Sequence, residues 1–358
     1  MPLPPFHESW SAEEQAVIVR FSERLEAFFK NELLNKADLP AVAPHLHSVI
    51  TTGACLPSSA DGDTLARLAA MIDEAEAMML FLQRGEDVNA VLLSDEALLP
   101  VSFASEVIWA ESLISTRQSA AERVQLLLKL QEMGWNPQTH AQSVIYAMPL
   151  LCAESRDVSP LYEWFFSLNY ELTPEQEATL YNALLISDGC ALIVKRLLEQ
   201  GKFAVNEPLG GGLLPLQQVC AKPLFEKVIN LDTLELLLSA GADPNLILVE
   251  EDFPAVNEEY DPHGYEEDDL PRDDMDGFST PIEMLFDHYR SELSEGNSKR
   301  EKNYLAAIDL LLIYGAELDI EEDEYDDEEA ESSAYAEVRK RLHMTPAELL
   351  SDFKRLTR

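Results

Sequence analysis

Basic residues are scarce in this chain of 358 residues. It has 26 lysines and arginines against 66 aspartates and glutamates, which gives a formal net charge of −40 at pH 7. Such a charge repels nucleic acid and anionic membranes and attracts basic proteins over long distances. We therefore expect no nucleic-acid or membrane partner. A basic protein partner and a simple role in solubility both remain open from the charge alone.

Cysteines are few, and long apolar runs are absent. Cys55, Cys152, Cys190 and Cys220 are far apart and form no C-x-x-C pair, which predicts reduced, buried thiols. No stretch of 18 or more apolar residues exists, so no membrane span is predicted. The first residues lack the basic and apolar regions of a signal peptide. The expected location is therefore cytoplasmic.

The common catalytic motifs are missing as well. The sequence has no H-E-x-x-H, G-x-G-x-x-G, G-x-x-x-x-G-K-[ST] or G-x-S-x-G segment. Gly210, Gly211 and Gly212 form a turn cluster without the lysine and hydroxyl residue of a phosphate loop. His45 and His47 have no cysteine or histidine partner nearby and are expected at the surface or at a helix end. We predict that the chain is not an enzyme and needs no cofactor.

One segment has part of the spacing of a calcium loop. Asp274, Asp276, Gly277 and Glu283 occupy positions 3, 5, 6 and 12 of an EF-hand. Position 1 would be Arg272, whose charge would oppose a cation. We therefore expect no metal site here.

A leucine-rich helical pattern that ends in Gly or Asn recurs along the chain. In LDTLELLLSAGADPN at 231–245, Leu231, Leu234 and Leu238 share one helical face. Gly241 can adopt the left-handed conformation that ends a helix, so it should tolerate valine much less well than Gly210 does. Similar segments lie at 78–89, 124–137, 193–206, 308–319 and 161–172, the last with Asn169 in the place of glycine.

A second recurring signal marks the starts of helices. Thr-Pro at 280–281 and at 345–346 combines an N-cap residue with proline at the first helical position, and Leu-Pro at 214–215 and Met-Pro at 148–149 hold the same place. The distances between these starts and the turn glycines add up to a unit of about 33 residues.

With GADPN at 241–245 and DGFSTP at 276–281, this unit resembles the ankyrin-repeat family from about residue 45 to the end. The resemblance implies an all-α solenoid of about six to seven helix-turn-helix units, whose loops project toward a concave binding face. The sequence departs from the family's TPLH motif, since Gln217, Glu283 and Glu348 stand where histidine is usual. The hydrogen bonds that this histidine supplies between turns are therefore not assured.

The two ends differ from the repeat. Residues 1–40 are predicted to form an N-terminal capping region, and residues 41–358 the repeat array. Ser11 and Glu14 have the spacing of a capping box, and apolar residues then follow at helical spacing at positions 17, 21, 25 and 28. Residues 346–353 resemble half a repeat that caps the C-terminal end.

Much of the negative charge is concentrated in two segments. Residues 250–276 contain 13 acidic residues and one basic residue, and residues 317–331 contain 11 acidic residues and no basic one. Both lie between a turn glycine and the next Thr-Pro start, which predicts insertions in the same loop of consecutive repeats. A third insertion, at 291–304, contains the most basic patch of the chain and should lengthen two helices.

The acidic insertions are either solvated loops without a specific use or an anionic clamp for a basic protein, and their aromatic residues favour the clamp. The leading hypothesis is a monomeric inhibitor or immunity protein that binds a basic toxin or nuclease, a role that the family resemblance implies. A general scaffold or adaptor and a host-directed effector stay open. The predicted partner-binding residues are Asp252, Phe253, Glu258, Glu259, Tyr260, Tyr265, Asp268, Asp269, Asp273, Asp274, Asp323, Glu324, Tyr325, Asp326 and Asp327.

Overall fold

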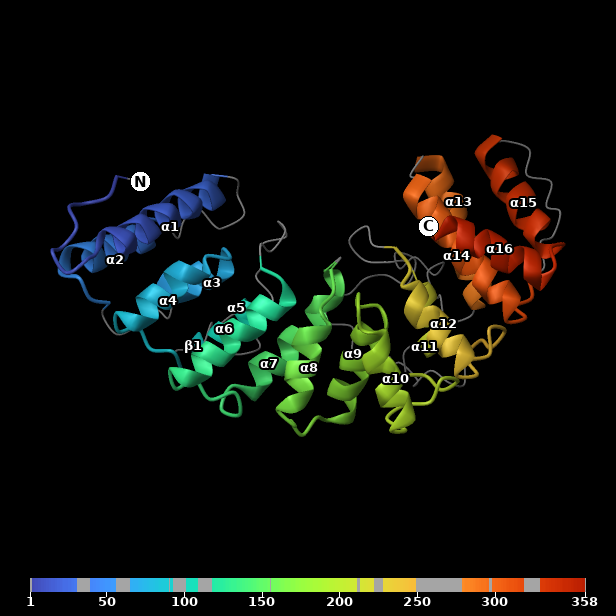
Figure 1. Cartoon of the computed structure of the whole chain (residues 1–358), viewed down its shortest axis with the longest axis horizontal. Coiled ribbons are helices and arrows are strands. Elements are labelled where there is room, and N and C mark those ends of the chain that lie inside the picture. The colour runs from blue at the N-terminus through green and yellow to red at the C-terminus, as the bar shows by residue number, and fades with distance from the viewer. Residues whose placement is uncertain are drawn as a thin grey trace, which may run out of the picture. The chain divides into compact units, whose positions relative to one another are not determined.

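The computed structural model describes residues 2–30, 39–55, 65–89, 91–92, 101–108, 118–154, 156–210, 213–221, 228–248, 279–295, 298–318 and 329–357. These residues form an all-α protein, as predicted, apart from one antiparallel pair of two-residue strands, β1 (Val91–Leu92) and β2 (Val101–Ser102). The chain divides into two compact units, and Figure 1 labels the helices of each. The first comprises Met1–Leu151 and Arg156–Glu171, and the second comprises Cys152–Ser155 and Leu172–Arg358.

The first unit is a stack of short helix pairs. α3 packs against α4 and α5 against α6, while α5 also packs on α3 and α7, and α6 on α8. The helices pair because each has one apolar face that it must bury. The bounds are α1 (Ala12–Lys30), α2 (Leu39–Thr52), α3 (Leu65–Met71), α4 (Ala75–Gln83), α5 (Phe103–Ile108), α6 (Ala120–Glu132), α7 (Ala141–Ala147), the 3-10 helix η1 (Met148–Ala153) and α8 (Ser159–Ser167).

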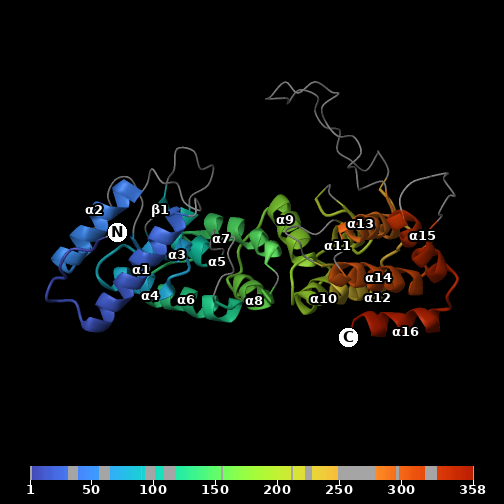
Figure 2. The same cartoon turned by 90° about the horizontal axis from the view of Figure 1, so that it is seen from above.

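The second unit has two layers of helices. One layer is α9, α11, α13 and α15, and the other is α10, α12, α14 and α16, with each helix packed on the next of its layer. Figure 2 shows the two layers of this unit side by side. The bounds are α9 (Pro174–Leu185), α10 (Ala191–Glu199), α11 (Pro215–Cys220), α12 (Leu231–Ser239), α13 (Pro281–Glu295), α14 (Ser298–Ile313), α15 (Glu329–Leu342) and α16 (Pro346–Leu356).

The predicted helix ends are confirmed. Gly241 follows α12 with φ +94°, and Asn169 follows α8 with φ +50°, so asparagine does take the left-handed position that glycine holds elsewhere. The equivalent turns carry Gly85, Gly134, Gly201 and Gly315, all with positive φ. Of the face predicted for α12, Leu234 and Leu238 are buried and Leu231 is half-buried.

The predicted helix starts are confirmed in part. α13 and α16 begin at Pro281 and Pro346, and Thr345 forms a capping box with Glu348. The prediction at Met148 and Pro149 is wrong, because these residues continue α7 as the 3-10 helix η1. The next helix pair starts instead with α9 at Pro174, and Thr173 caps that helix.

Two N-terminal helices pack on the first helix pair, and the second of them, α2, extends past the boundary at residue 40 that the sequence predicts. α1 packs on α4 and α2 packs on α3. Phe21 of α1 meets Phe81 of α4 edge to face, with ring centroids 5.3 Å apart. The capping box is present, since the Ser11 amide donates to the Glu14 carboxylate at 2.8 Å and the Glu14 amide donates to the Ser11 hydroxyl at 3.2 Å.

The C-terminal end differs from the prediction. The interval between Gly315 and Thr345 is not one long loop, because it contains α15, which packs on α13. α16 then packs on α14, in the other layer. The unit therefore ends on a complete helix pair and not on half a repeat.

The third insertion does lengthen two helices, as predicted. α13 and α14 have 15 and 16 residues, against six and nine in α11 and α12. Arg300 of α14 pairs with the Glu292 carboxylate of α13 at 2.8 Å, close to the turn between them. The basic patch thus contributes a contact within this helix pair.

Candidate partner-binding surface

All fifteen predicted partner-binding residues fall in the ranges 249–278 and 319–328, which lie outside the described residues. The described residues give the points where each range leaves the fold and where it returns. The first range leaves after α12 and returns at Ser279, just before α13. The second leaves after α14 and returns at α15. Both ranges therefore follow a helix of the same layer, in successive helix pairs.

Asparagine side chains link the turns of successive pairs. Asn206 donates to the Gly241 carbonyl at 3.1 Å and accepts from the Asp243 amide at 2.9 Å. Asn245 repeats this pattern one pair later. It donates to the Gly315 carbonyl at 3.0 Å and accepts from the Glu317 amide at 2.8 Å. In the first unit, Asn89 donates to the Gly134 carbonyl at 3.3 Å and Gln138 to the Leu168 carbonyl at 2.9 Å.

The Asn245 link joins the two turns that precede the acidic ranges. Asn245 stands shortly before residue 249, and Glu317 shortly before residue 319. This role of asparagine was not predicted from the sequence. The signal was the recurrence of Asn or Gln four or five residues after the turn glycine, a spacing that a local helix or turn does not explain.

Gln217 binds Ser279, the first described residue after the first acidic range. Its side-chain amide is fully buried and donates to the carbonyl of Ser279 at 2.9 Å, while its oxygen accepts from the Leu214 amide at 3.1 Å. It thus makes a bond to the next turn at the position where the ankyrin family has histidine. Glu283 and Glu348 stand at the same motif position, and the bonds of each join it to the threonine that starts its own helix.

An open pocket of about 230 Å³ lies between α9 and the loop that follows α10. Tyr181 and Phe203 provide its aromatic surface, with ring centroids 5.8 Å apart. Glu177 accepts from the Tyr181 hydroxyl at 3.4 Å and lies 3.9 Å from Lys202 Nζ. Burial, with a smaller contribution from the charge of Glu177, raises the pKa of Tyr181 to about 12, so the Tyr181 hydroxyl stays neutral at physiological pH. Pro174, Ala178, Ala204, Glu207, Pro208, Leu209 and Gly210 complete the lining.

Gly210 fixes the edge of this pocket. Its φ is +65°, and a Cβ on it would lie 2.4 Å from the Cβ of Ala178 on α9. A Cβ on Gly241 would meet no heavy atom within 4 Å. The prediction that Gly210 tolerates valine better than Gly241 is therefore contradicted. Both have a positive φ, and Gly210 also has a neighbour in the way.

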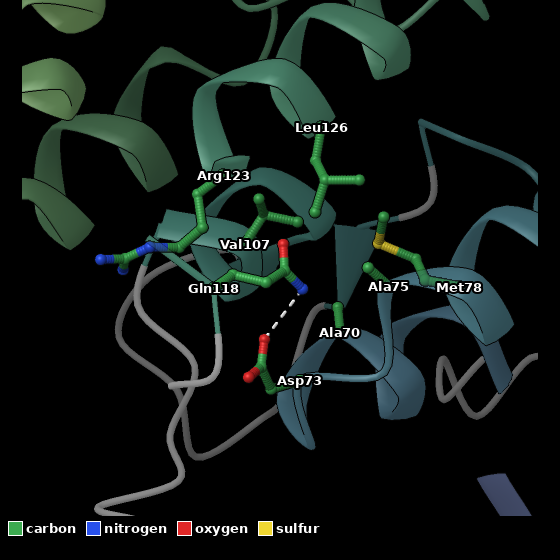
Figure 3. A pocket seen from close by; sticks show the side chains of 8 residues that line it. All are labelled: Ala70, Asp73, Ala75, Met78, Val107, Gln118, Arg123 and Leu126. Carbon is green, nitrogen blue, oxygen red and sulfur yellow. Dashed lines mark hydrogen bonds between the residues drawn. The ribbon is translucent and has the colours of Figure 1, made fainter. Parts of the chain in front are cut away.

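The first unit contains a much smaller cavity, shown in Figure 3. Its volume is about 10 Å³, which is room for one water molecule. The Gln118 amide donates to the Asp73 carboxylate at 2.9 Å, and Arg123 turns away from this pair to donate to the Ile108 carbonyl at 2.5 Å. Ala70, Ala75, Met78, Val107 and Leu126 line the rest. The cavity is too small for a small-molecule substrate.

A buried charge cluster lies between α14, α15 and α16. Arg341 donates to the Asp309 carboxylate at 2.8 Å, also bonds Glu337, and lies 3.7 Å from Asp352. Arg341 and Asp309 are both almost fully buried. Burial raises the pKa of Asp309 to about 6, since the loss of water outweighs the attraction of Arg341. The cluster joins three helices, so we assign it to packing.

The remaining candidates for chemistry have structural surroundings. Cys55, Cys190 and Cys220 are free and buried as predicted, and Cys152 is half-buried. Burial raises the pKa of the Cys55 thiol to about 12, far from the range of a reactive thiolate. His45 lies 3.8 Å from Glu86, whose carboxylate accepts from the first amides of α3.

The described residues contain no cluster of three or more His, Cys, Asp or Glu side chains that could hold a metal ion. Of the calcium-loop spacing, Asp274, Asp276 and Gly277 lie outside the described residues, and Glu283 caps α13. Within the described parts of the chain, no helix is both long and apolar enough to cross a membrane.

Neither a scan of family models nor searches of curated proteins and of solved structures find a match to this chain.

Proposed function

We propose that this chain is a non-enzymatic protein-binding module with an ankyrin-like repeat architecture, and that it inhibits or neutralises a basic protein such as a toxin or nuclease. Three features support the architecture. Short helices stack in two layers, left-handed turn residues end the helices that precede the linked turns, and asparagine side chains join successive turns.

The single observation that carries the function is the Asn245 link. It joins the turn before one acidic range to the turn before the next, and these two segments contain 13 and 11 acidic residues. Like charges brought together repel, and this repulsion weakens the fold. A cationic partner surface would relieve the repulsion, and it would be attracted to the site over long distances.

The first test is capture of the partner, followed by binding kinetics. The tagged chain is incubated with extract of its own organism, bound proteins are identified by mass spectrometry, and the association rate is measured by stopped flow at two salt concentrations. We expect a basic partner whose association slows as salt rises, because exposed charges are screened beyond about 8–10 Å at physiological ionic strength. If the partner is an enzyme, its activity should fall when the chain is bound.

The second test separates the acidic ranges from net charge. Two variants change four carboxylates each to amides, one set in each range: Asp268, Asp269, Asp273 and Asp274, or Asp323, Glu324, Asp326 and Asp327. A matched control changes four exposed carboxylates elsewhere to glutamine: Glu13, Glu132, Glu199 and Glu235. Both range variants should slow association with the same partner severalfold more than the control does. Equal rates in all three variants would reduce the acidic ranges to a role in solubility.

A further inference from the structure

The pocket between α9 and residues 202–210 combines aromatic rings with charged side chains, a combination that helix packing alone does not require. Its aromatic side chains are Tyr181 and Phe203, which belong to different elements and meet at a tilt. Tyr181 is buried, while Phe203 is only partly covered and still has surface to offer. An aromatic surface of this kind attracts cations through the negative faces of its rings.

Carboxylates accompany the aromatic rings. Glu177 and Glu207 both line the pocket, and Lys202 is the one cation among its lining residues. The Glu177 and Lys202 side chains are 3.9 Å apart and are 38% and 50% exposed, so water screens their attraction. Ion pairs of this exposure contribute little to stability, so an incoming cation can replace Lys202.

The volume limits what the pocket can hold. Pockets for drug-sized ligands have volumes of about 300–1,000 Å³, and this pocket has about 230 Å³. Its size suits one long side chain better than a cofactor or metabolite. Gly210 sets this size, because its backbone approaches Ala178 more closely than any other residue type would allow.

We propose that this pocket receives one arginine side chain of a basic protein partner. The guanidinium lies against the Phe203 ring and takes the Glu177 and Glu207 carboxylates as hydrogen-bond acceptors. Arginine fits better than lysine because its planar group both stacks on aromatic rings and binds carboxylates through several donors. The inference rests on the proposed function, and it adds an anchor point on described residues to the charge of the acidic ranges.

The position of the pocket supports this assignment. Residues 202–210 follow α10, and the two acidic ranges follow α12 and α14, which are the next helices of the same layer. Asn206 lies in this loop and bonds the turn after α12. The pocket loop is therefore tied to the turn that leads into the first acidic range, so one partner surface can reach both.

The test uses the full chain with labelled alanine methyl groups and a synthetic probe, acetyl-Gly-Arg-Gly-amide. Ala178 and Ala204 line the pocket, so their methyl NMR signals report binding there and nowhere else. We expect both signals to shift with the arginine peptide, less with the lysine peptide, and hardly at all with the neutral citrulline peptide. The variant E177Q/E207Q should weaken binding about 3- to 10-fold. K202Q should strengthen it about 2-fold, because it removes the competing cation.

E235Q is the control, since it removes an exposed carboxylate of α12 outside the pocket and should leave the affinity unchanged. Equal shifts with citrulline, or binding that E177Q/E207Q does not weaken, would overturn the arginine pocket. So would an arginine peptide that leaves Ala178 and Ala204 unmoved. Partner capture and the charge variants of the acidic ranges test the proposed function independently, so either idea can fail while the other stands.

Discussion

Replacing Leu238 by alanine tests the packing of the second unit. Leu238 lies on α12 and is 3% exposed, and α12 packs on α10, α11 and α14. The change removes buried carbon atoms and leaves a cavity, because neighbours held in other helices close it only partly. Leucine-to-alanine changes of this kind cost about 2–5 kcal/mol. Leu192 on α10 is 80% exposed and provides the control, for which we expect a loss within about 0.5 kcal/mol.

The four tryptophans allow the two units to be followed separately. Trp10, Trp109, Trp135 and Trp164 all belong to the first unit, so tryptophan fluorescence reports on that unit and circular dichroism on both. In urea, Leu238→Ala should move the unfolding midpoint seen by circular dichroism down by roughly 0.7–5 M, given slopes of about 1–3 kcal/mol per M. The fluorescence midpoint should move less. A loss below about 0.5 kcal/mol, or an equal loss for Leu192→Ala, would refute the assigned packing face.

Two further predictions concern the turns and the buried charges. Gly210→Val should destabilise the second unit at least as much as Gly241→Val, because both residues have positive φ and only the side chain added at Gly210 would collide with Ala178. Urea unfolding midpoints in the opposite order would contradict this prediction. Burial raises the pKa of Asp309 to about 6, so between about pH 4 and pH 6 the folded state keeps a proton that the unfolded state loses. The protonated carboxyl of Asp309 therefore stabilises the fold fully below about pH 4, and this stabilisation is lost as pH rises through 6. Asp309→Asn, which cannot titrate beside Arg341, should therefore gain up to about 3 kcal/mol relative to the wild type as pH rises from below 4 to 7. Urea unfolding at pH 5 and pH 7.5 should show about half of this gain. A relative loss over the same range would be evidence against the raised pKa.

The helix ends were predictable because they depend on single residues. Gly241 and Asn169 stand where the chain needs a positive φ, and few other residue types take that conformation without strain. The cap at Thr345 is equally local. Met148 and Pro149 misled because proline is compatible with the start of a helix and also with a 3-10 turn, and the end of α7 decides between them.

α15 was hidden by its composition. Its buried side includes Ala334, Val338 and Arg341, of which only one is a large apolar residue. Hydrophobic periodicity cannot identify a face on which a buried arginine is neutralised by Asp309 of another helix. The acidic residues just before α15 also made the whole interval resemble a loop. The helix became recognisable only through its packing on α13.

The candidate site was predictable in charge but not in geometry. The count of acidic residues and the interval between Gly241 and Thr280 follow from the sequence. The hydrogen bonds of Asn245 and Gln217 do not follow from the sequence, since each side chain reaches a residue more than 60 positions away. Tyr181 and Phe203 carried no motif, and only the fold brings them together.

The placement of the acidic ranges argues against a role in solubility alone. A long loop adds little conformational cost to a fold, since doubling its length costs only about 0.6 kcal/mol. Charge that serves solubility could therefore be spread over many loops, where its repulsion would be least. Here 23 of the 40 net negative charges lie in two segments, and Asn245 joins the turns that precede them. Such an arrangement raises the repulsion within the chain and, with it, the attraction for a basic surface. The added repulsion is offset only if a cationic partner binds the acidic segments, and the charge variants test this premise.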